Sequence, residues 1–501
     1  MVKAMLRGVP AALAALASCV CLGQSSVVFD CRDLPRGLLH AVQTIDATAL
    51  NIENGVAVLR YPQWVPGSHA PGGPVQNIAG LWFEDQDENT IVWRRTPGDV
   101  YRFEVEVPDG LDELTVRFRY IANQPTANSR GLDTFGSADM GLVSPNTAIV
   151  YPEHLNDDEF DVAAGLVLPD GWSAACALDV AREDAVAIEY DPVSIRRLVD
   201  TPILMGLHHR EYSLNEDGDD APRHTLHVIS ERADAAEIPD ETVAAYSAMV
   251  TQAAHMFGSF PFESMDILLG VTDQLPRNGL EHLRSTMNIL PTASFETFDA
   301  LRGWDQMLVP HEYVHAWCGK YRRPEGMLTG DFHTPKGSEL LWVYEGLTTY
   351  LAEVLENRAG LFEDGEYLWS VRGSLRRSFL QQGRDWRPLI DTCAASHTLR
   401  ARSANWGHLR RSQDYYGEGA LIWMEADAII RTGTDGVKSL DDFCRLFFAS
   451  GGWTDEPKPF THEQVLADLN AVYEHDWAGF FERRLLGTGG RGPVLLARKL
   501  G

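Results

Sequence analysis

Two histidines and a glutamate near the middle of the chain have the spacing of a metal site. His311 and His315 are four residues apart, so a helix would place both imidazoles on one face, where they can bind one cation. Glu312 lies beside them and could take a proton from a water molecule that the metal activates. This His-Glu-x-x-His pattern is typical of zinc hydrolases. The alternative is a pair of helical histidines without a metal.

A further carboxylate follows in an apolar setting. The sequence Leu-Trp-Val-Tyr-Glu-Gly-Leu-Thr-Thr-Tyr at 341–350 predicts a buried helix that carries a single charge, Glu345. A loop and this second helix can bring Glu345 back to the first helix as the third ligand. Two histidines and one glutamate leave the fourth zinc position open, as catalysis requires. The sequence therefore predicts one Zn²⁺ per chain, held by His311, His315 and Glu345.

The composition describes a folded, acidic protein of several domains. With 501 residues, the chain exceeds one ordinary domain, and a hydrophobic content of 45% can supply two or three cores. Acidic residues outnumber basic ones by 71 to 43, which gives a net charge of −28. This charge repels phosphate backbones and argues against nucleic-acid binding. Beyond the first residues, no segment is apolar enough to span a membrane.

The N-terminus resembles an export signal. Lys3 and Arg7 precede an apolar run at residues 8–23, which is too short to span a bilayer stably. Cleavage after residue 23 would release a secreted chain. Alternatively, Leu-Ala-Ser-Cys at 16–19 resembles the bacterial lipoprotein box, which would end the signal at residue 18 and leave Cys19 as a lipid anchor. Either alternative predicts export, to the periplasm, to the outer membrane as a lipoprotein, or to the medium.

The hydrophobic pattern changes once along the rest of the chain. Short alternating segments, such as 56–61 and 114–120, predict a β-rich domain over residues 24–235. Its Pro-Gly pairs near residue 70, Pro66-Gly67-Ser68 and Pro71-Gly72-Gly73, are interpreted as turns without a chemical role. Near residue 235 the pattern becomes helical at 241–257, and we place a domain boundary there.

The remainder is predicted to be a catalytic domain followed by helices. Residues 236–355 contain two strand-like segments, 265–271 and 286–290, ahead of the predicted zinc helix. Residues 356–501 are predicted to be mainly helical, with glycines 417 and 419 interrupting one segment. The widely spaced cysteines indicate neither a disulfide framework nor a cysteine zinc site, although one bridge, such as Cys31 to Cys176, stays open.

Several motifs together resemble the glycyl aminopeptidase family of gluzincin zinc peptidases, which are relatives of aminopeptidase N. They are Pro-Gln-Trp-Val-Pro-Gly-Ser at 62–68, Asn-Gly-Leu-Glu-His at 278–282, His-Glu-Tyr-Val-His-Ala-Trp at 311–317, Arg323-Pro324, and Leu-Trp-Val-Tyr-Glu-Gly at 341–346. The resemblance covers most of the chain. It implies an α+β multidomain fold with a β-rich N-terminal domain, a thermolysin-like catalytic domain and a helical C-terminal portion.

The resemblance also implies roles for residues outside the metal site. Glu281 matches the glutamate that binds the free amine of the substrate. Tyr416 matches the tyrosine that donates a hydrogen bond to the developing oxyanion, with Tyr415 as the alternative. Glu418 stands where the family has a lysine, a charge reversal beside Tyr416. Many relatives continue into a PDZ module, and none is expected in this chain.

These expectations describe a zinc aminopeptidase that removes N-terminal residues, glycine or other small ones, from peptides with a free N-terminus. Glu312 would be the general base. Two alternatives remain open. One is a zinc endopeptidase in which Glu281 is structural, and the other is a catalytically silent scaffold that binds peptides.

Overall fold

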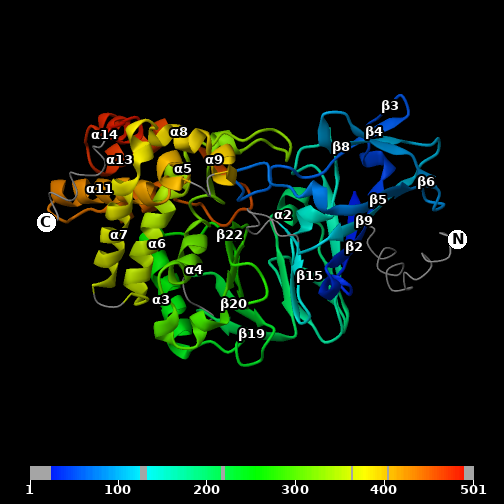
Figure 1. Cartoon of the computed structure of the whole chain (residues 1–501), viewed down its shortest axis with the longest axis horizontal. Coiled ribbons are helices and arrows are strands. Elements are labelled where there is room, and N and C mark those ends of the chain that lie inside the picture. Colours follow the sequence, from blue (N-terminus) through cyan, green and yellow to red (C-terminus); the bar gives the residue numbers. More distant parts are fainter. Residues whose placement is uncertain (1–23, 124–132, 216–220, 363–364, 403–405, 490–501) are drawn as a thin grey trace.

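The N-terminal part of the protein is built from β-sheets (Figure 1). The computed structural model describes residues 24–123, 133–215, 221–362, 365–402 and 406–489. Within them, the largest sheet comprises β1 (Ser25–Asp30), β2 (Leu38–Asp46), β5 (Ile78–Glu84), β6 (Thr90–Ile91), β9 (Glu113–Ile121), β13 (Asp161–Val167), β15 (Val180–Glu183), β16 (Ala187–Tyr190) and β17 (Val193–Ser194). Its order is β15-β16-β13-β1-β2-β9-β5-β6, with β17 paired to β13.

Two smaller sheets complete this half of the molecule. One contains β10 (Phe135–Gly136), β11 (Met140–Val143), β14 (Ser173–Ala175) and β18 (Ile203–Gly206), and the other contains β3 (Ile52–Glu53), β4 (Val56–Arg60), β7 (Trp93–Thr96), β8 (Asp99–Glu106) and β12 (Tyr151–Pro152). In β2, β4 and β9 buried and less buried residues mostly alternate, because successive side chains of a strand point to opposite faces. The strands predicted at 56–61 and 114–120 are confirmed.

The catalytic part contains a mixed sheet whose two edge strands run antiparallel to the interior. Its strands are β19 (His208–Ser213), β20 (Arg223–Ser230), β21 (Ser264–Val271), β22 (Asn278–His282) and β23 (Ser285–Leu290). The order is β19-β20-β21-β23-β22, with β20, β21 and β23 parallel. The strands predicted at 265–271 and 286–290 are β21 and β23, and both are almost entirely buried, as expected for interior strands.

The division between the sheets lies before residue 235, where the sequence predicts the domain boundary. Strands β19 and β20 precede this position, yet they belong to the catalytic sheet because β20 pairs with β21 along its length. The periodicity changes at 235 because a strand gives way to helix α3 (Asp240–Phe257). A change from strand to helix can be detected in a sequence, whereas a change of sheet between two strands of similar pattern cannot.

Helices pack around the catalytic sheet and make up most of the regular structure that the described residues form after it (Figure 1). Besides α3 they are α4 (Trp304–Val314), α5 (Leu341–Tyr344), α6 (Gly346–Ala359), α7 (Glu366–Leu380), α8 (Leu389–Ala394), α9 (Ser396–Arg402), α10 (Gly407–Arg410), α11 (Gly417–Gly433), α12 (Leu440–Phe447), α13 (His462–Val472) and α14 (Trp477–Leu485). The short helix α2 (Ile195–Val199) belongs to the N-terminal half, where it contacts β13 and β17. Helix α6 is central, since α3, α4 and α11 all pack against it. A short parallel pair, β24 (Arg322–Pro324) and β25 (Lys458–Phe460), ties the segment before α13 to the segment after α4.

Two details differ from the sequence analysis. The predicted apolar helix at 341–350 is divided into α5 and α6, with Glu345 between them. The glycines at 417 and 419 lie in the first turn of α11 and do not interrupt a longer helix.

The cysteines of the described residues, Cys31 and Cys176 included, are unbonded. Among these residues, no helix combines the length and the apolar composition that a membrane span needs.

Candidate active site

The predicted metal ligands converge at the contact of α4 with the junction of α5 and α6. His311 and His315 lie on one face at the end of α4, and their Nε2 atoms are 3.1 Å apart. Glu345 approaches from the α5–α6 junction, with its Oε2 atom 3.3 Å from His311 Nε2 and 3.2 Å from His315 Nε2. All three side chains are buried.

These distances fit a zinc ion. Ligands that bind tetrahedral zinc at ~2.0–2.2 Å lie about 3.3–3.5 Å from one another, close to the separations of the three atoms. Glu345 Oε2 is buried and makes no hydrogen bond in the described structure. When both imidazoles are neutral, their lone pairs and the carboxylate oxygen repel one another, and a cation between the three atoms accounts for their convergence.

The charge states of the ligands suit the same interpretation. Burial lowers the pKa of His311. Burial by itself would raise the pKa of Glu345, but His315 and His69 outweigh it and hold that pKa well below its usual value. Burial lowers the pKa of His315, yet the carboxylates of Glu281 and Glu345 raise it to about 9, so a metal ion competes with a proton at this nitrogen.

Neighbouring groups orient His315. Its Nδ1 atom lies 2.8 Å from the backbone oxygen of Cys318, to which it donates, and 3.3 Å from the hydroxyl of Thr348. This contact directs Nε2 toward the metal position. The hydroxyl of Thr349 donates to the backbone oxygen of Glu345 at 2.8 Å and not to its carboxylate. The threonine that contacts the side chain of a predicted ligand is Thr348, whose hydroxyl lies beside His315 Nδ1.

Glu281 and Glu312 lie beside the zinc position. Their carboxylates and a ring nitrogen of His315 fall within 4.8 Å of one another. Glu281 is on the edge strand β22, where the hydroxyl of Tyr344 donates to it at 2.5 Å. Burial would raise the pKa of Glu281, but His315 and Lys320 lower it, so this buried group is a carboxylate. Glu312 lines a cavity of about 970 Å³ that opens beside the ligands.

The structure distinguishes the two tyrosines that the sequence left open. Tyr416 lines the same cavity as His311 and Glu312, and its hydroxyl donates to Glu345 Oε1 at 3.0 Å. Tyr415 is fully buried. Helices α6 and α11 touch at two glycines, where a Cβ on Gly346 would lie 2.7 Å from the Cα of Gly419. This close approach holds Tyr416 next to Glu345.

The charge reversal at Glu418 is balanced inside the protein. Its Oε2 atom accepts a hydrogen bond from Arg411 at 2.5 Å, and its Oε1 atom lies 3.0 Å from Arg384. Both contacts are buried or nearly so, and together they compensate the carboxylate. Glu418 therefore anchors the start of α11, beside Tyr416, with two arginines.

One residue of the site comes from the N-terminal domain and was missed. His69 Nε2 hydrogen-bonds to Glu345 Oε1, and both side chains are 3% exposed. The turn before His69 packs against β22, because a Cβ on Gly67 would contact Leu280 at 2.9 Å and Glu281 at 3.4 Å. Gly67 itself has a φ of +78°. The turn predicted at Pro66-Gly67-Ser68 is confirmed, and it positions the following residue, His69, at the site. The available signal was the family motif at 62–68, which ends one residue before His69.

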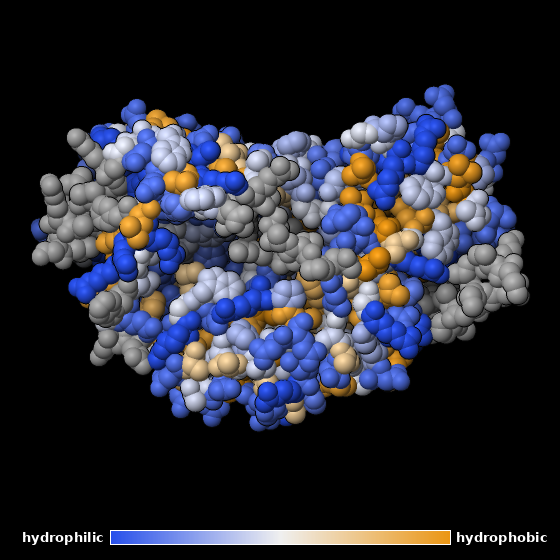
Figure 2. Space-filling view, in the orientation of Figure 1, coloured by the Kyte–Doolittle hydropathy of each residue, from blue (hydrophilic) through white to orange (hydrophobic). Residues whose placement is uncertain are grey.

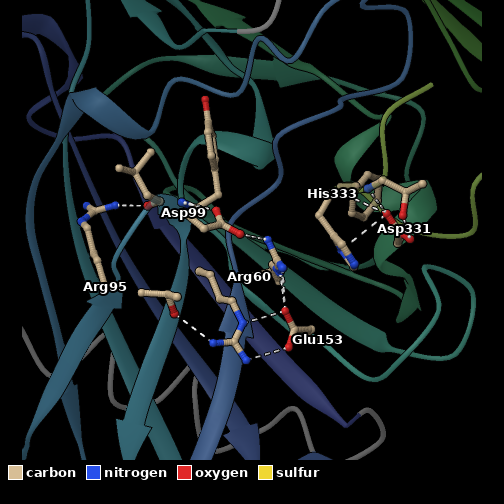
Figure 3. Close-up of polar contacts among 12 residues, drawn as sticks. Arg60, Arg95, Asp99, Glu153, Asp331 and His333 are labelled. Carbon is tan, nitrogen blue, oxygen red and sulfur yellow. Dashed lines mark hydrogen bonds and ion pairs between the residues drawn. The ribbon is translucent and has the colours of Figure 1, made fainter. Parts of the chain in front are cut away.

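A contact between the two halves of the molecule holds this loop. The backbone N–H groups of Gln63 and Trp64 donate to the carbonyl of Phe332 at 3.0 and 2.8 Å, and the hydroxyl of Tyr151 accepts from Phe332 N at 3.3 Å. Figure 3 shows the surrounding polar groups, with Arg60, Arg95, Asp99 and Glu153 on the N-terminal side and Asp331 and His333 on the catalytic side. The loop that carries His69 is therefore fixed to the catalytic domain at its base.

A buried ion pair fixes the other side of the site. Asp200, at the end of α2, accepts from Lys320 Nζ at 2.8 and 2.9 Å and contacts His282 Nδ1 at 3.1 Å. Burial would raise the pKa of Asp200, but Lys320 and His282 lower it to about 2. This group links the N-terminal domain to the residue after Glu281 and to the segment after the zinc helix.

This fold and this ligand set define a zinc metallopeptidase. Two family models match the chain: the Peptidase M61 N-terminal domain at residues 29–207 and the M61 glycyl aminopeptidase domain at residues 305–422. Together they cover more than half of the sequence, and the chain belongs to the M61 glycyl aminopeptidase family. No curated protein matches it.

Solved structures share the fold. A crystal structure of an aminopeptidase N family protein from Idiomarina loihiensis is 20% identical, with a TM-score of 0.80 over 95% of this chain and 78% of its own. The M1 zinc metallopeptidase from Deinococcus radiodurans is 14% identical, with a TM-score of 0.53 over 93% of each chain. A mutant of the latter, bound to a Tyr-Ser-Ala substrate, is 13% identical at the same TM-score.

Proposed function

We propose that this metallo-aminopeptidase removes single residues, glycine or other small ones, from the free N-terminus of peptides. The position of Glu281 carries this proposal: a buried carboxylate on an edge strand, within 4.8 Å of Glu312 and His315. Such a group can pair with the ammonium of the first residue and so place the first peptide bond at the metal. The family description supports glycine, and the tripeptide bound to a structural neighbour supports short peptides as substrates.

The proposed chemistry assigns one task to each residue. When bound to His311, His315 and Glu345, zinc would activate a water molecule and polarise the peptide carbonyl. Glu312 accepts the proton of that water and delivers it to the leaving amine. Tyr416 lines the cavity, and its hydroxyl can turn from Glu345 to the developing oxyanion and stabilise it.

Blocking the substrate amine tests the role of Glu281. Purified protein lacking residues 1–23 is given glycyl and alanyl peptides in free and N-acetylated form. Cleavage of the free peptides alone supports the aminopeptidase, because acetylation removes the charge that Glu281 binds. Equal cleavage of both forms would instead indicate an endopeptidase in which Glu281 is structural, and no cleavage with no bound zinc would indicate a silent scaffold.

We also propose that the protein is exported. The supporting segment, residues 1–23 with Cys19, lies outside the described residues. Cell fractionation with and without an inhibitor of lipoprotein processing separates the two forms of the proposal. A membrane-associated precursor that accumulates under the inhibitor supports the lipid anchor at Cys19, whereas unchanged processing supports free secretion to the periplasm or the medium.

A further inference from the structure

A second group of two histidines and one glutamate lies at the opposite edge of the catalytic sheet. His209 and Glu211 are two residues apart on β19, so their side chains lie on the same face of the strand. His227 is on the adjacent strand β20, directly opposite Glu211. The three side chains therefore converge across the β19–β20 pair. Strands β20, β21 and β23 separate this edge from β22, which borders the zinc helix.

The separations in this group match those of the catalytic ligands. His209 Nε2 lies 3.1 Å from His227 Nδ1. Glu211 Oε1 lies 3.4 Å from His227 Nδ1 and 3.6 Å from His209 Nε2. Ligands of a tetrahedral zinc ion lie about 3.3–3.5 Å apart, so the three atoms stand at three corners of such a site.

A buried carboxylate behind the group fixes one of the histidines. Asp266, on β21, lies 3.2 Å from His227 Nε2, and its side chain is 7% exposed. A carboxylate accepts hydrogen bonds, so His227 donates from Nε2 and keeps the lone pair of Nδ1 for the side that faces His209 and Glu211. Metal-binding histidines typically have this arrangement, with a carboxylate behind the ring.

We propose that His209, Glu211 and His227 bind one divalent transition-metal cation, such as Zn²⁺, with Asp266 orienting His227. Two imidazoles and one carboxylate suit zinc and its neighbours better than magnesium or calcium. The side chain of Glu211 is 61% exposed, so the ion can enter from solvent and this carboxylate can close over it. Figure 2 shows a mostly hydrophilic surface along the lower edge of the molecule, where β19 lies.

The ion would serve a structural purpose. Strand β19 is the edge of the catalytic sheet and pairs on one side with β20. A cation shared by both strands adds a crosslink at this edge, and it stabilises the folded protein by mass action. The proposal is independent of the peptidase activity, because none of its residues takes part in the hydrolytic site.

Metal counting on the full chain tests the proposal. Wild-type protein, freed of metal and then dialysed against micromolar Zn²⁺, is expected to contain two zinc ions per chain. His209→Gln and Glu211→Gln are expected to contain one, and both should cleave glycyl peptides at the wild-type rate, which shows that they are folded. His208→Gln, on the other face of the same strand, is the matched control and should keep two ions.

A titration with Co²⁺ identifies the ligands. The second equivalent should produce a visible absorption band in the wild type and in His208→Gln, and this band should be absent in His209→Gln. Asp266→Asn should weaken the second binding event about 10–100-fold without abolishing it. One zinc ion per wild-type chain, or a second ion that persists in His209→Gln, would overturn the proposal and leave a hydrogen-bonded histidine pair only.

Discussion

The molecule brings together two histidines and a glutamate in two places, and their surroundings differ. In the first, a helix supplies His311 and His315, and a helix junction supplies Glu345. In the second, two neighbouring strands supply His209, Glu211 and His227. The separations of the ligand atoms are similar, from 3.1 to 3.3 Å in the first and from 3.1 to 3.6 Å in the second.

What surrounds the ligands therefore decides what each cluster can do. The helical cluster (His311, His315 and Glu345) is buried and borders a cavity of about 970 Å³. The carboxylates of Glu281 and Glu312 lie next to it. The strand cluster (His209, Glu211 and His227) contacts the buried Asp266 through His227, and Glu211 is exposed to solvent. In our proposal, a general base, an anchor for the substrate amine and a cavity make the first a catalytic centre, whereas the second holds an ion that stabilises a sheet edge.

The sharpest difference between the clusters is Glu312. Replacing it by glutamine keeps the size of the side chain but removes the base, so hydrolysis of a glycyl peptide should fall about 10²–10⁴-fold. Zinc content should be unchanged, because Glu312 is not a ligand. In the strand cluster, replacing the proposed ligand Glu211 by glutamine should leave hydrolysis intact. Retained activity in Glu312→Gln would refute the general-base assignment.

Tyr416 is the second feature peculiar to the helical cluster. Tyr416→Phe removes the hydroxyl that lines the cavity, and kcat should fall about 10²–10³-fold, as for other oxyanion donors, with little loss of zinc. Tyr415→Phe is the matched control and should keep its turnover, because this side chain is buried and does not line the cavity. Turnover at the wild-type level in Tyr416→Phe would remove this tyrosine from the mechanism.

Each cluster also has a buried partner behind one ligand, which is His69 in the first and Asp266 in the second. His69→Ala should weaken zinc binding at the helical cluster about 10–100-fold, because Glu345 loses the group that orients it. The measurement is competition with a zinc chelator, compared with Ser68→Ala, whose side chain contacts its own loop. Identical zinc affinities in the two variants would show that His69 packs against Glu345 without orienting it.

Acid should weaken the buried ion pair between Asp200 and Lys320, which lies beside the helical cluster. The pKa of Asp200 is lowered to about 2 in the folded protein from an ordinary 3.8, so this carboxylate stabilises the fold above pH 4. That stability is lost as the pH falls from about 4 to about 2, and the difference amounts to about 2 kcal/mol.

Urea unfolding at pH 4.5 and at pH 2.5 measures this loss. The comparison uses the wild type and the double variant Asp200→Asn with Lys320→Met, which removes both charges of the pair and avoids leaving Lys320 buried and unpaired. The double variant should lose about 1.5 kcal/mol less than the wild type between the two pH values, because the folded pKa of about 2 lies below the lower pH. Equal losses would mean that the ion pair does not contribute to the acid sensitivity.

The sequence predicts those parts of the site that depend on local geometry. The four-residue spacing of His311 and His315 requires only a helix, and Glu345 stands out as a charge in an apolar segment. Glu281 and Tyr416 were found through the family resemblance, and the structure places both beside the metal position, although their roles remain predictions. The helix at 241–257 and the buried strands before the zinc helix were likewise predicted from periodicity.

The missed features all depend on contacts between distant segments. His69 reaches Glu345 only because a loop of one domain docks on the other, which no local pattern reports. His209 and His227 meet because of the register between β19 and β20, and register is set by pairing and burial across the sheet. The membership of β19 and β20 in the catalytic sheet was missed for the same reason.

A single titration can distinguish one catalytic ion from one structural ion in the same chain. Metal-free chain is supplied with Zn²⁺ in steps while bound zinc and the hydrolysis of a free glycyl peptide are measured together. We predict that two equivalents bind and that the rate rises with one of them, while the other binds without changing the rate. A rate that rises with both equivalents, or a chain that saturates at one ion, would contradict the assignment of one catalytic and one structural ion.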